Sequence, residues 1–212
     1  MLLFDTHTHI AEEEYNEDRL DVLERARAAG VVHMINVGYN LESSSRAVEL
    51  AEKNEMIYAS VGFHPHNALE AGPGYLAELR CLAAHPRVVA IGEIGLDYYR
   101  DLSPRDVQRR VFEEQLELAG ELELPVIIHV RDAYGDLMSI LRRRGVGPAG
   151  GVMHCYSGSW EIAQECMAMG FYISFAGPVT YKNAAKLQAI AQAAPLDRIL
   201  VETDSPYLTP EP

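Results

Sequence analysis

Short apolar segments rich in β-branched residues recur along the chain, and most are followed by a longer segment in which apolar residues return every three or four positions. The first kind of segment is typical of a buried β-strand, and the second of an amphipathic helix. Eight segments are of the first kind: residues 2–9, 31–39, 56–66, 88–97, 125–130, 150–158, 171–177 and 198–206. Seven helical segments lie between them: residues 19–30, 42–55, 75–85, 103–123, 133–145, 159–170 and 183–195. The pattern therefore predicts repeated strand–helix units.

Strands that alternate with single helices build a parallel sheet, and eight such units are the number found in a closed (β/α)8, or TIM, barrel. An open doubly wound sheet is the alternative, but that fold carries a glycine-rich first turn, whereas the first turn here reads THTHIAEEE. The sequence thus predicts an α/β TIM barrel in a single domain of residues 1–212. Because a typical barrel has about 250 residues and ends in an eighth helix, we expect that final helix to be missing and the domain to be truncated at its C-terminus.

Composition narrows the functional classes. The net charge of −13 repels the phosphate backbone of a long duplex, which disfavours a general nucleic-acid binder and leaves a metal-dependent enzyme open. The three cysteines, Cys81, Cys155 and Cys166, show no paired spacing, which indicates a reducing compartment, and we expect the cytoplasm. No apolar run approaches 18 residues, so we expect no membrane span. We expect a monomer, although the sequence does not fix the oligomeric state.

Polar residues with metal-binding or catalytic side chains collect at the ends of the predicted strands. They are Asp5, His7 and His9 on the first strand, His64 and His66 on the third, Glu93 and Asp97 on the fourth, His129 and Arg131 on the fifth, His154 on the sixth, and Glu202 and Asp204 on the eighth. In a barrel these ends meet on one rim, where barrel enzymes carry their chemistry. Only His33 and His85, of the eight histidines, fall elsewhere, and we interpret them as structural.

This pattern favours two metal sites. His7 and His9 face the same side of a strand, because side chains alternate, and Asp204 on the neighbouring eighth strand would complete a first site. His129 and His154, on adjacent strands, would hold a second ion, and Glu93 would bridge two ions about 3.5–4 Å apart. Each motif alone has a structural alternative, such as a core histidine or an aspartate that caps a turn. Such ligands accept Mg²⁺, Mn²⁺, Zn²⁺ or Ni²⁺, so the native metal stays open.

Six sequence blocks, DTHTHI, GFHPH, GEIGLDYYRD, PVIIHVRDA, HCYSGS and ETDSPYL, occur in this order and span nearly the whole chain. Together they resemble the TatD family of metal-dependent hydrolases, within the amidohydrolase superfamily. The resemblance implies a TIM barrel, a divalent metal centre and hydrolysis of phosphodiesters as a deoxyribonuclease, often a 3′–5′ exonuclease. It implies that His7, His9 and Asp204 form one metal site, that His129 and His154 form the second, and that Glu93 bridges them. The family normally continues beyond the PYLTP block with a loop bearing arginine and asparagine and a helical tail, which this sequence lacks.

The remaining polar residues suggest roles in catalysis and substrate binding. Asp204 is the best candidate to accept a proton from the attacking water, with Glu93 fixing the separation of the ions. The predicted substrate-binding residues are His64 and His66, which as cations suit a phosphate, Arg131, which would hold a phosphate through two hydrogen bonds, and Tyr98, which, like Tyr99 and Tyr156, would stack on bases. The structural alternatives are a stiff turn at Pro65 and ordinary aromatic packing. Glu202 is either a partner of the site or a buried structural acid.

Three functions remain open from the sequence. The first is a metal-dependent deoxyribonuclease that trims the 3′ ends of DNA, and the acidic surface suits single-stranded ends better than a duplex. The second is a hydrolase of another ester or amide, such as the aminoacyl ester of a D-aminoacyl-tRNA. The third is a metal-stabilised scaffold, which is disfavoured because structural metal sites prefer cysteine. The sequence does not determine the physiological substrate or the polarity of cleavage.

Overall fold

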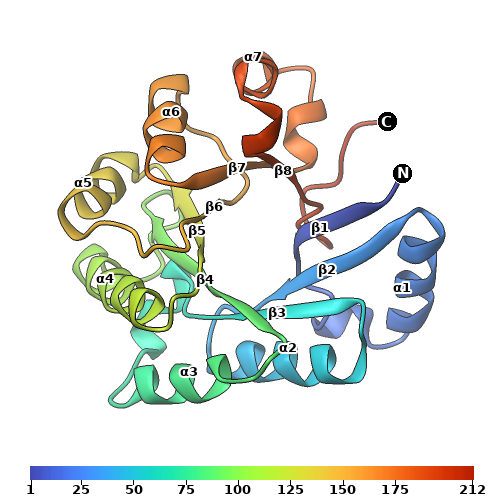
Figure 1. The fold of residues 1–212 in the computed structure, drawn as a ribbon, viewed down its shortest axis with the longest axis horizontal. Coiled ribbons are helices and arrows are strands. Elements are labelled where there is room, and N and C mark those ends of the chain that lie inside the picture. The colour runs from blue at the N-terminus through green and yellow to red at the C-terminus, as the bar shows by residue number, and fades with distance from the viewer.

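A computed structural model, which describes residues 1–212, shows one sheet rolled into a ring with helices around its outside (Figure 1). All eight strands are parallel, and each pairs with the next in chain order. The strands are β1 (Leu3–Thr8), β2 (Val31–Val37), β3 (Ile57–Val61), β4 (Val88–Asp97), β5 (Val126–Arg131), β6 (Gly151–Met153), β7 (Phe171–Phe175) and β8 (Ile199–Val201). The helices are α1 (Arg19–Ala28), α2 (Leu41–Lys53), α3 (Tyr75–Ala83), α4 (Arg105–Glu121), α5 (Tyr134–Arg144), α6 (Trp160–Ala168) and α7 (Ala185–Ala193). The predicted TIM-barrel architecture is confirmed.

Short 3₁₀ helices lie in the loops: η1 (Glu13–Tyr15), η2 (Pro65–Glu70), η3 (Gly177–Thr180) and η4 (Leu196–Arg198). Local sequence signals account for some of the ends of the α-helices. The Ser159 side chain accepts a hydrogen bond from the Ile162 N–H and caps α6, and Gly145, with φ of 76°, ends α5. None of the helices has the length and apolarity required to cross a bilayer.

The barrel closes between β1 and β8 at the carboxyl ends of these strands only. Thr8 and Ser205 form an isolated parallel bridge, the His9 N–H donates to the Ser205 carbonyl at 2.8 Å, and the Asp204 N–H donates to the His7 carbonyl at 2.9 Å. These backbone bonds bring the first and last strands together where their polar side chains lie.

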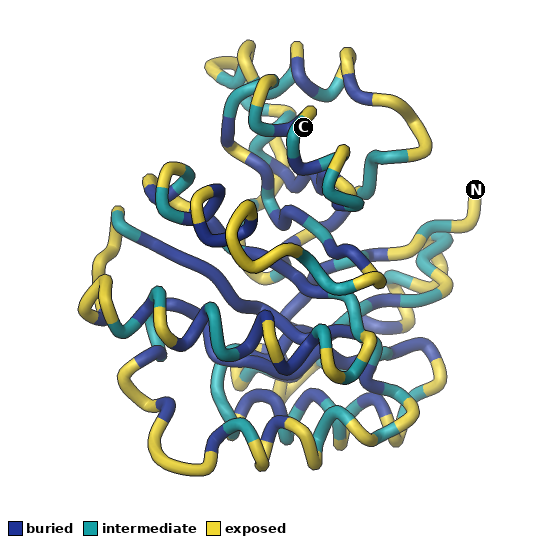
Figure 2. Tube along the Cα trace, turned by 60° about the vertical axis from the view of Figure 1, so that its left-hand side comes forward, coloured by how far each residue is buried: buried dark blue, intermediate teal, exposed yellow.

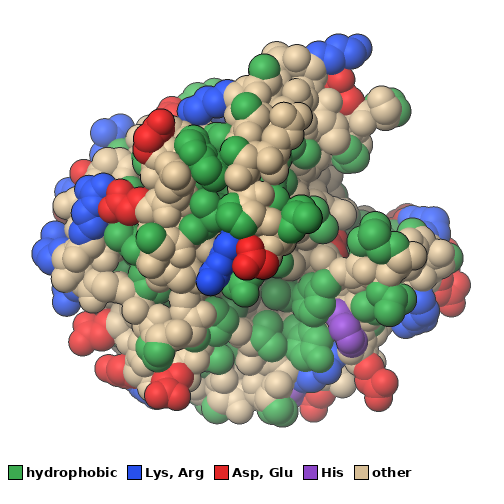
Figure 3. All heavy atoms as spheres, turned by 45° about the horizontal axis from the view of Figure 1, so that its top comes forward, with side chains coloured by type: hydrophobic (Ala, Val, Ile, Leu, Met, Phe, Trp, Pro, Cys, Tyr) green, Lys and Arg blue, Asp and Glu red, His purple; other side chains and the backbone are tan.

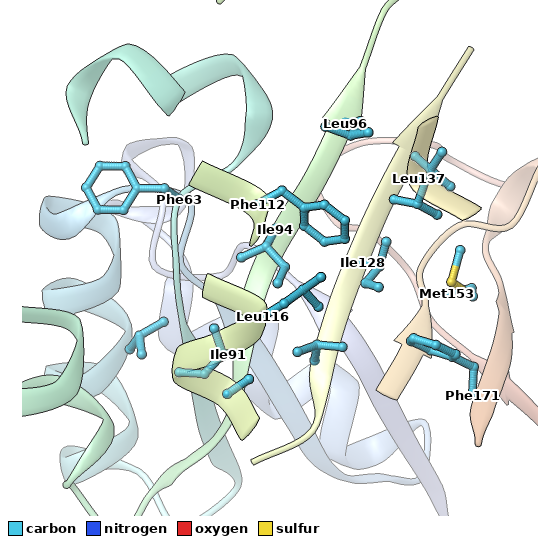
Figure 4. Close-up of a cluster of buried hydrophobic side chains, with 14 of the residues drawn as sticks. Phe63, Ile91, Ile94, Leu96, Phe112, Leu116, Ile128, Leu137, Met153 and Phe171 are labelled. Atoms are coloured by element: carbon cyan, nitrogen blue, oxygen red, sulfur yellow. The ribbon is translucent and has the colours of Figure 1, made fainter. Parts of the chain in front are cut away.

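The best-packed part of the fold is the sector of β4, β5 and α4. Almost every residue of β4 is buried, as expected for a strand of a parallel sheet that is covered on both faces. Figure 2 shows buried residues concentrated along the strands and exposed ones on the outer helices and loops. Figure 4 shows Phe112 and Leu116 of α4 against Ile94 of β4, beside Ile128 of β5. This packing fixes the two strands in register.

Gly95 allows an especially close approach of β4 to β5. Its φ is +145°, and a Cβ atom there would lie 1.9 Å from the His129 carbonyl oxygen. Only glycine accommodates both conditions. The consequence is that β4 and β5 present Glu93 and His129 side by side.

The β8–β1 sector has less cover. In the ring of Figure 1 no helix lies outside β8 and β1, between α7 and α1, and no helix follows β8 in residues 202–212. Phe4 and Val32 are 39% exposed and Val201 is 54% exposed. Figure 3 shows hydrophobic side chains gathered beside a recess on one face of the molecule. The outer surface of these strands is therefore partly apolar and open.

Candidate metal centre

The polar residues at the strand ends lie together on one rim of the barrel. His7 and His9 lie at the end of β1, His64 and His66 after β3, Glu93 and Asp97 on β4, His129 on β5, His154 after β6, and Glu202 and Asp204 after β8. All except His66 and His129 are buried. Burying so many ionisable groups is costly unless they pair with one another or with a cation.

The first tight group consists of His7, His9 and Asp204, as the sequence predicted. The Nε2 atoms of the two histidines lie 3.3 Å apart, and Asp204 Oδ1 lies 3.6 Å from His7 Nε2 and 3.4 Å from His9 Nε2. Ligand atoms at about 2.1 Å from one tetrahedral cation are about 3.4 Å from each other. The three atoms therefore have the spacing required to share one divalent cation.

Glu93 lies at the centre of the cluster. Its Oε2 is 3.4 Å from His7 Nε2, while its Oε1 is 2.9 Å from His129 Nδ1 and 3.6 Å from the Nε2 atoms of both His64 and His154. Burial raises the pKa of this carboxyl group, but the surrounding histidines outweigh burial and hold the pKa well below its usual range. One carboxylate thus faces two groups of imidazoles, which is the geometry a bridging ligand needs.

His129 lies between two carboxylates. Its Nδ1 faces Glu93, and its Nε2 lies 3.1 Å from Asp97 Oδ2, which also accepts from His66 Nε2 at 2.8 Å. Burial lowers the pKa of His129, but the hydrogen bonds to Asp97 and Glu93 outweigh it and raise the pKa. Each ring nitrogen of His129 therefore lies within hydrogen-bonding distance of a carboxylate oxygen.

His154 is oriented by Glu202, one of the two roles that the sequence left open for that residue. His154 Nδ1 lies 2.8 Å from Glu202 Oε1, and Glu202 also accepts from the Cys155 N–H and the Ser174 hydroxyl. Burial lowers the pKa of His154, but Glu202 and Glu93 outweigh it and raise the pKa to about 10. Burial raises the pKa of Glu202, and His154 outweighs it, so that the pKa falls to about 2. The pair directs His154 Nε2 toward Glu93 and Asp204.

A second group of possible ligand atoms consists of His64, Glu93 and His129, and His154 also faces Glu93. His129 lies nearest to His64 and Glu93, with ring centroids 4.4 Å apart for the two histidines, whereas the His129 and His154 rings are 6.4 Å apart. Burial lowers the pKa of His64 well below its usual range. His64 is buried with its Nε2 3.6 Å from Glu93 Oε1, and it also lines the cavity, so its predicted role in phosphate binding stays a prediction. His66 is more exposed and is held by Asp97.

A cavity of about 560 Å³ opens above this cluster. Arg131 lines it as predicted, and its guanidinium lies 3.8 Å from the ring centroid of Tyr99. The structure does not bring Tyr98 to the cavity, because the Tyr98 hydroxyl donates to Asp136 at 2.6 Å on the helical side of the barrel. Tyr156 lines the cavity but is 1% exposed, so it offers little ring surface for stacking.

Sequence reasoning missed the apolar side of this cavity. The additional lining residues are Tyr39, Ala176, Pro178, Leu187, Tyr207 and Leu208. Tyr39 and Tyr207 follow strands, as the recognised residues do, so the strand-end rule applied to aromatic residues would have found them. Leu187 gives no such signal, because a leucine on an amphipathic helix is indistinguishable from a core residue.

Comparisons with known proteins agree with the resemblance noted in the sequence. A family model described as "TatD related DNase" matches residues 4–212. The chain is 49% identical over 211 residues to "Uncharacterized metal-dependent hydrolase YabD" of Bacillus subtilis (strain 168), covering 100% of this chain and 83% of that protein. It is 40% identical over 209 residues to "3'-5' ssDNA/RNA exonuclease TatD" of Cronobacter turicensis, covering 98% and 80%. The crystal structure of YJJV, a TatD homolog from Escherichia coli K12, is 34% identical and superposes with a TM-score of 0.93, covering 99% of this chain and 81% of that chain.

Proposed function

The chain belongs to the TatD family of metal-dependent hydrolases, and from this premise we propose that it cleaves phosphodiester bonds of nucleic acids, removing nucleotides from a 3′ end. The single barrel domain of residues 1–212 carries the proposed activity. A cytoplasmic location stays a prediction that rests on the cysteine spacing.

The observation that carries the proposal is the triangle of His7 Nε2, His9 Nε2 and Asp204 Oδ1, with edges of 3.3, 3.6 and 3.4 Å. It is supported by Glu93, which faces this triangle with one oxygen and the other imidazoles with its second oxygen. A scaffold without catalytic function would need no such open group of nitrogen and oxygen ligands next to a cavity.

We propose two divalent cations, chosen from Mg²⁺, Mn²⁺, Zn²⁺ and Ni²⁺. His7, His9 and Asp204 would hold one, and His129 and His154 would hold the other, with Glu93 shared and His64 a further candidate ligand. Bound cations would supply a lowered pKa for the attacking water and would neutralise the charge on the phosphate.

The protein's own side chains then have separate tasks. Asp204 accepts the proton of the attacking water, because its carboxylate lies beside His9 and also lines the cavity. Glu202 and Asp97 hold His154 and His129 in fixed orientations. Arg131 binds a phosphate oxygen, and its position over Tyr99 leaves the guanidinium edge free to do so. His66 lines the same cavity and contributes a further hydrogen bond to the phosphate.

Single-stranded ends are the proposed substrate. The net charge of −13 opposes wrapping of a duplex, and the only arginine that lines the cavity is Arg131. A single strand that enters by its end brings one phosphate at a time to the cluster, and so needs few cationic contacts.

The test is degradation of a 5′-labelled single-stranded oligonucleotide with Mg²⁺ or Mn²⁺. We expect a ladder that shortens from the 3′ end and that disappears with EDTA, with His7→Ala and with His9→Ala. His33→Ala is the matched control, since it removes an imidazole that packs edge-to-face against Tyr58 outside the cavity. Intact oligonucleotide would refute the proposal, and hydrolysis of an aminoacyl ester by the same preparation would identify the alternative.

A further inference from the structure

One side of the cavity has no candidate metal ligand. It is formed by two segments and one helix: Ala176 and Pro178 after β7, Leu187 on α7, and Tyr207 and Leu208 after β8. We call these five residues the apolar wall. The proposed hydrolysis uses none of them, although they occupy a large part of the lining.

The two segments of the apolar wall are held together by a close backbone approach and by hydrogen bonds between side chains and backbone. A Cβ atom on Gly177 would lie 1.9 Å from the Leu208 carbonyl oxygen, so the segments touch where only glycine fits. The Tyr181 hydroxyl donates to the Thr209 carbonyl at 3.1 Å, and the Glu211 N–H donates to Thr180 Oγ1 at 2.8 Å. The wall is therefore a fixed surface rather than two independent loops.

The apolar wall adjoins the metal triangle directly. The Tyr207 N–H donates to the Asp204 carbonyl at 2.8 Å, and the Tyr207 and His9 ring centroids are 5.7 Å apart. Tyr207 nevertheless remains 52% exposed, so much of its ring is not covered by protein. A large free aromatic surface thus lies one side chain away from the group that would hold the phosphate.

We propose that the apolar wall is a binding subsite for one unpaired nucleobase, that of the nucleotide whose phosphate lies at the metal triangle; this inference rests on the proposed function. Every base has a flat π-face that stacks on an aromatic ring without regard to sequence. The volume of about 560 Å³ is within the range of cavities that hold one small ligand. A base inside a duplex is covered by its neighbours and its pairing partner, so the apolar wall selects frayed or single-stranded ends.

The test compares the binding of deoxyadenosine 5′-monophosphate with that of deoxyribose 5-phosphate by calorimetry, in the presence of Mn²⁺. We expect the nucleotide to bind at least about tenfold more tightly, as one base–aromatic stack provides. Tyr207→Ala should reduce nucleotide affinity to nearly that of the sugar phosphate and leave the sugar phosphate unchanged. Tyr207→Phe should retain the difference, because the ring remains.

Two further variants make the result specific. Leu187→Ser changes the apolar wall from another element and should also reduce the preference for the nucleotide. Tyr172→Ala is the matched control, since Tyr172 is 39% exposed on β7, is absent from the cavity lining and packs against Arg198. Equal affinity for the two ligands, or an equal loss of both with Tyr207→Ala, would overturn the subsite.

Because this assay measures binding, it separates the subsite from the proposed function. Preferential nucleotide binding by a chain that cleaves no oligonucleotide supports the subsite and refutes the nuclease. Cleavage of oligonucleotides without preference for the nucleotide refutes the subsite and retains the nuclease.

Discussion

The β4–β5 side and the β8–β1 side of the barrel both supply candidate ligands, but the fold holds them by different means. β4 has ten residues, almost all of them buried, either inside the barrel or beneath the surrounding helices. β8 has three residues, none of them fully buried, and no helix follows it in residues 202–212. Glu93 and His129 are therefore fixed by packing, whereas His7, His9 and Asp204 are fixed mainly by backbone hydrogen bonds between the chain's first and last strands. The comparison indicates that one half of the candidate site is preformed and that the other half depends more on what it binds.

The largest expected effect is on stability and concerns the well-packed β4–β5 side of the barrel. Phe112→Ala should lower the free energy of unfolding by about 3–5 kcal/mol, because it empties a fully buried site beneath α4. Phe4→Ala should lower it by less than about 1 kcal/mol, because Phe4 is 39% exposed on the uncovered sector. Urea denaturation measures both. Equal losses would show that the two sectors are packed alike.

The next largest effect concerns Glu93, whose carboxylate lies between His7 of β1 and His129 of β5. Glu93→Gln should reduce cleavage of a single-stranded oligonucleotide roughly 10³-fold, about 4 kcal/mol, because the shared carboxylate charge is lost. Glu78→Gln, an exposed change on α3, is the matched control and should keep full activity. A Glu93→Gln protein that folds and cleaves within tenfold of the wild type would contradict the bridging role.

Removal of the metal should affect the β8–β1 side of the barrel more than the β4–β5 side. At a cation concentration 100 times its Kd, a chelator should lower the free energy of unfolding by about 2.7 kcal/mol. Hydrogen exchange should accelerate at the amides of His9 and Asp204, which link β1 to β8, while the amides of β5 keep their protection. His9→Ala should respond less to the chelator. Uniform acceleration over the barrel would refute a local effect.

The smallest effect concerns the orientation of His154. Glu202→Gln should weaken binding of Mn²⁺ by about 10–100-fold, because a carboxylate that orients a ligating histidine has this magnitude of effect. Ser174→Ala removes only one hydrogen bond to Glu202 and should weaken binding less than about tenfold. Isothermal calorimetry measures both, and an identical loss for the two variants would contradict a specific role for the Glu202 charge.

Hydrophobic periodicity predicted the bounds of β4 more accurately than those of β6 and β8. The predicted strand 88–97 matches β4 at both ends, since its run is apolar and buried on both faces. The predicted strands 150–158 and 198–206 shrink to β6 and β8, three residues each. Their remainders carry Cys155 and Asp204, whose φ angles of 41° and 56° turn the backbone out of the sheet. Polar residues at the end of a predicted strand therefore indicate the candidate site, but they lie beyond the end of the observed strand.

The membership of the candidate site was predictable, and its internal grouping was predictable only in part, for His7, His9 and Asp204. The barrel rule places all strand ends on one rim, so the sequence suffices to gather His7, His9, Glu93, His154 and Asp204 there. Which imidazole faces which carboxylate depends on side-chain directions across several strands. Tyr98, for example, is held by Asp136 of α5 and does not line the cavity, and nothing in the sequence indicates this contact.

The bridge between Thr8 and Ser205 also orders events during protein synthesis. Thr8 and Ser205 are 197 residues apart in the chain. The histidines of β1 are therefore synthesised long before the residues that follow β8. At about 5–20 residues per second, that interval lasts roughly 10–40 s. During it the nascent chain can build the β4–β5 sector but cannot assemble the His7–His9–Asp204 triangle. Any activity that needs this triangle therefore begins only after Ser205 has been synthesised.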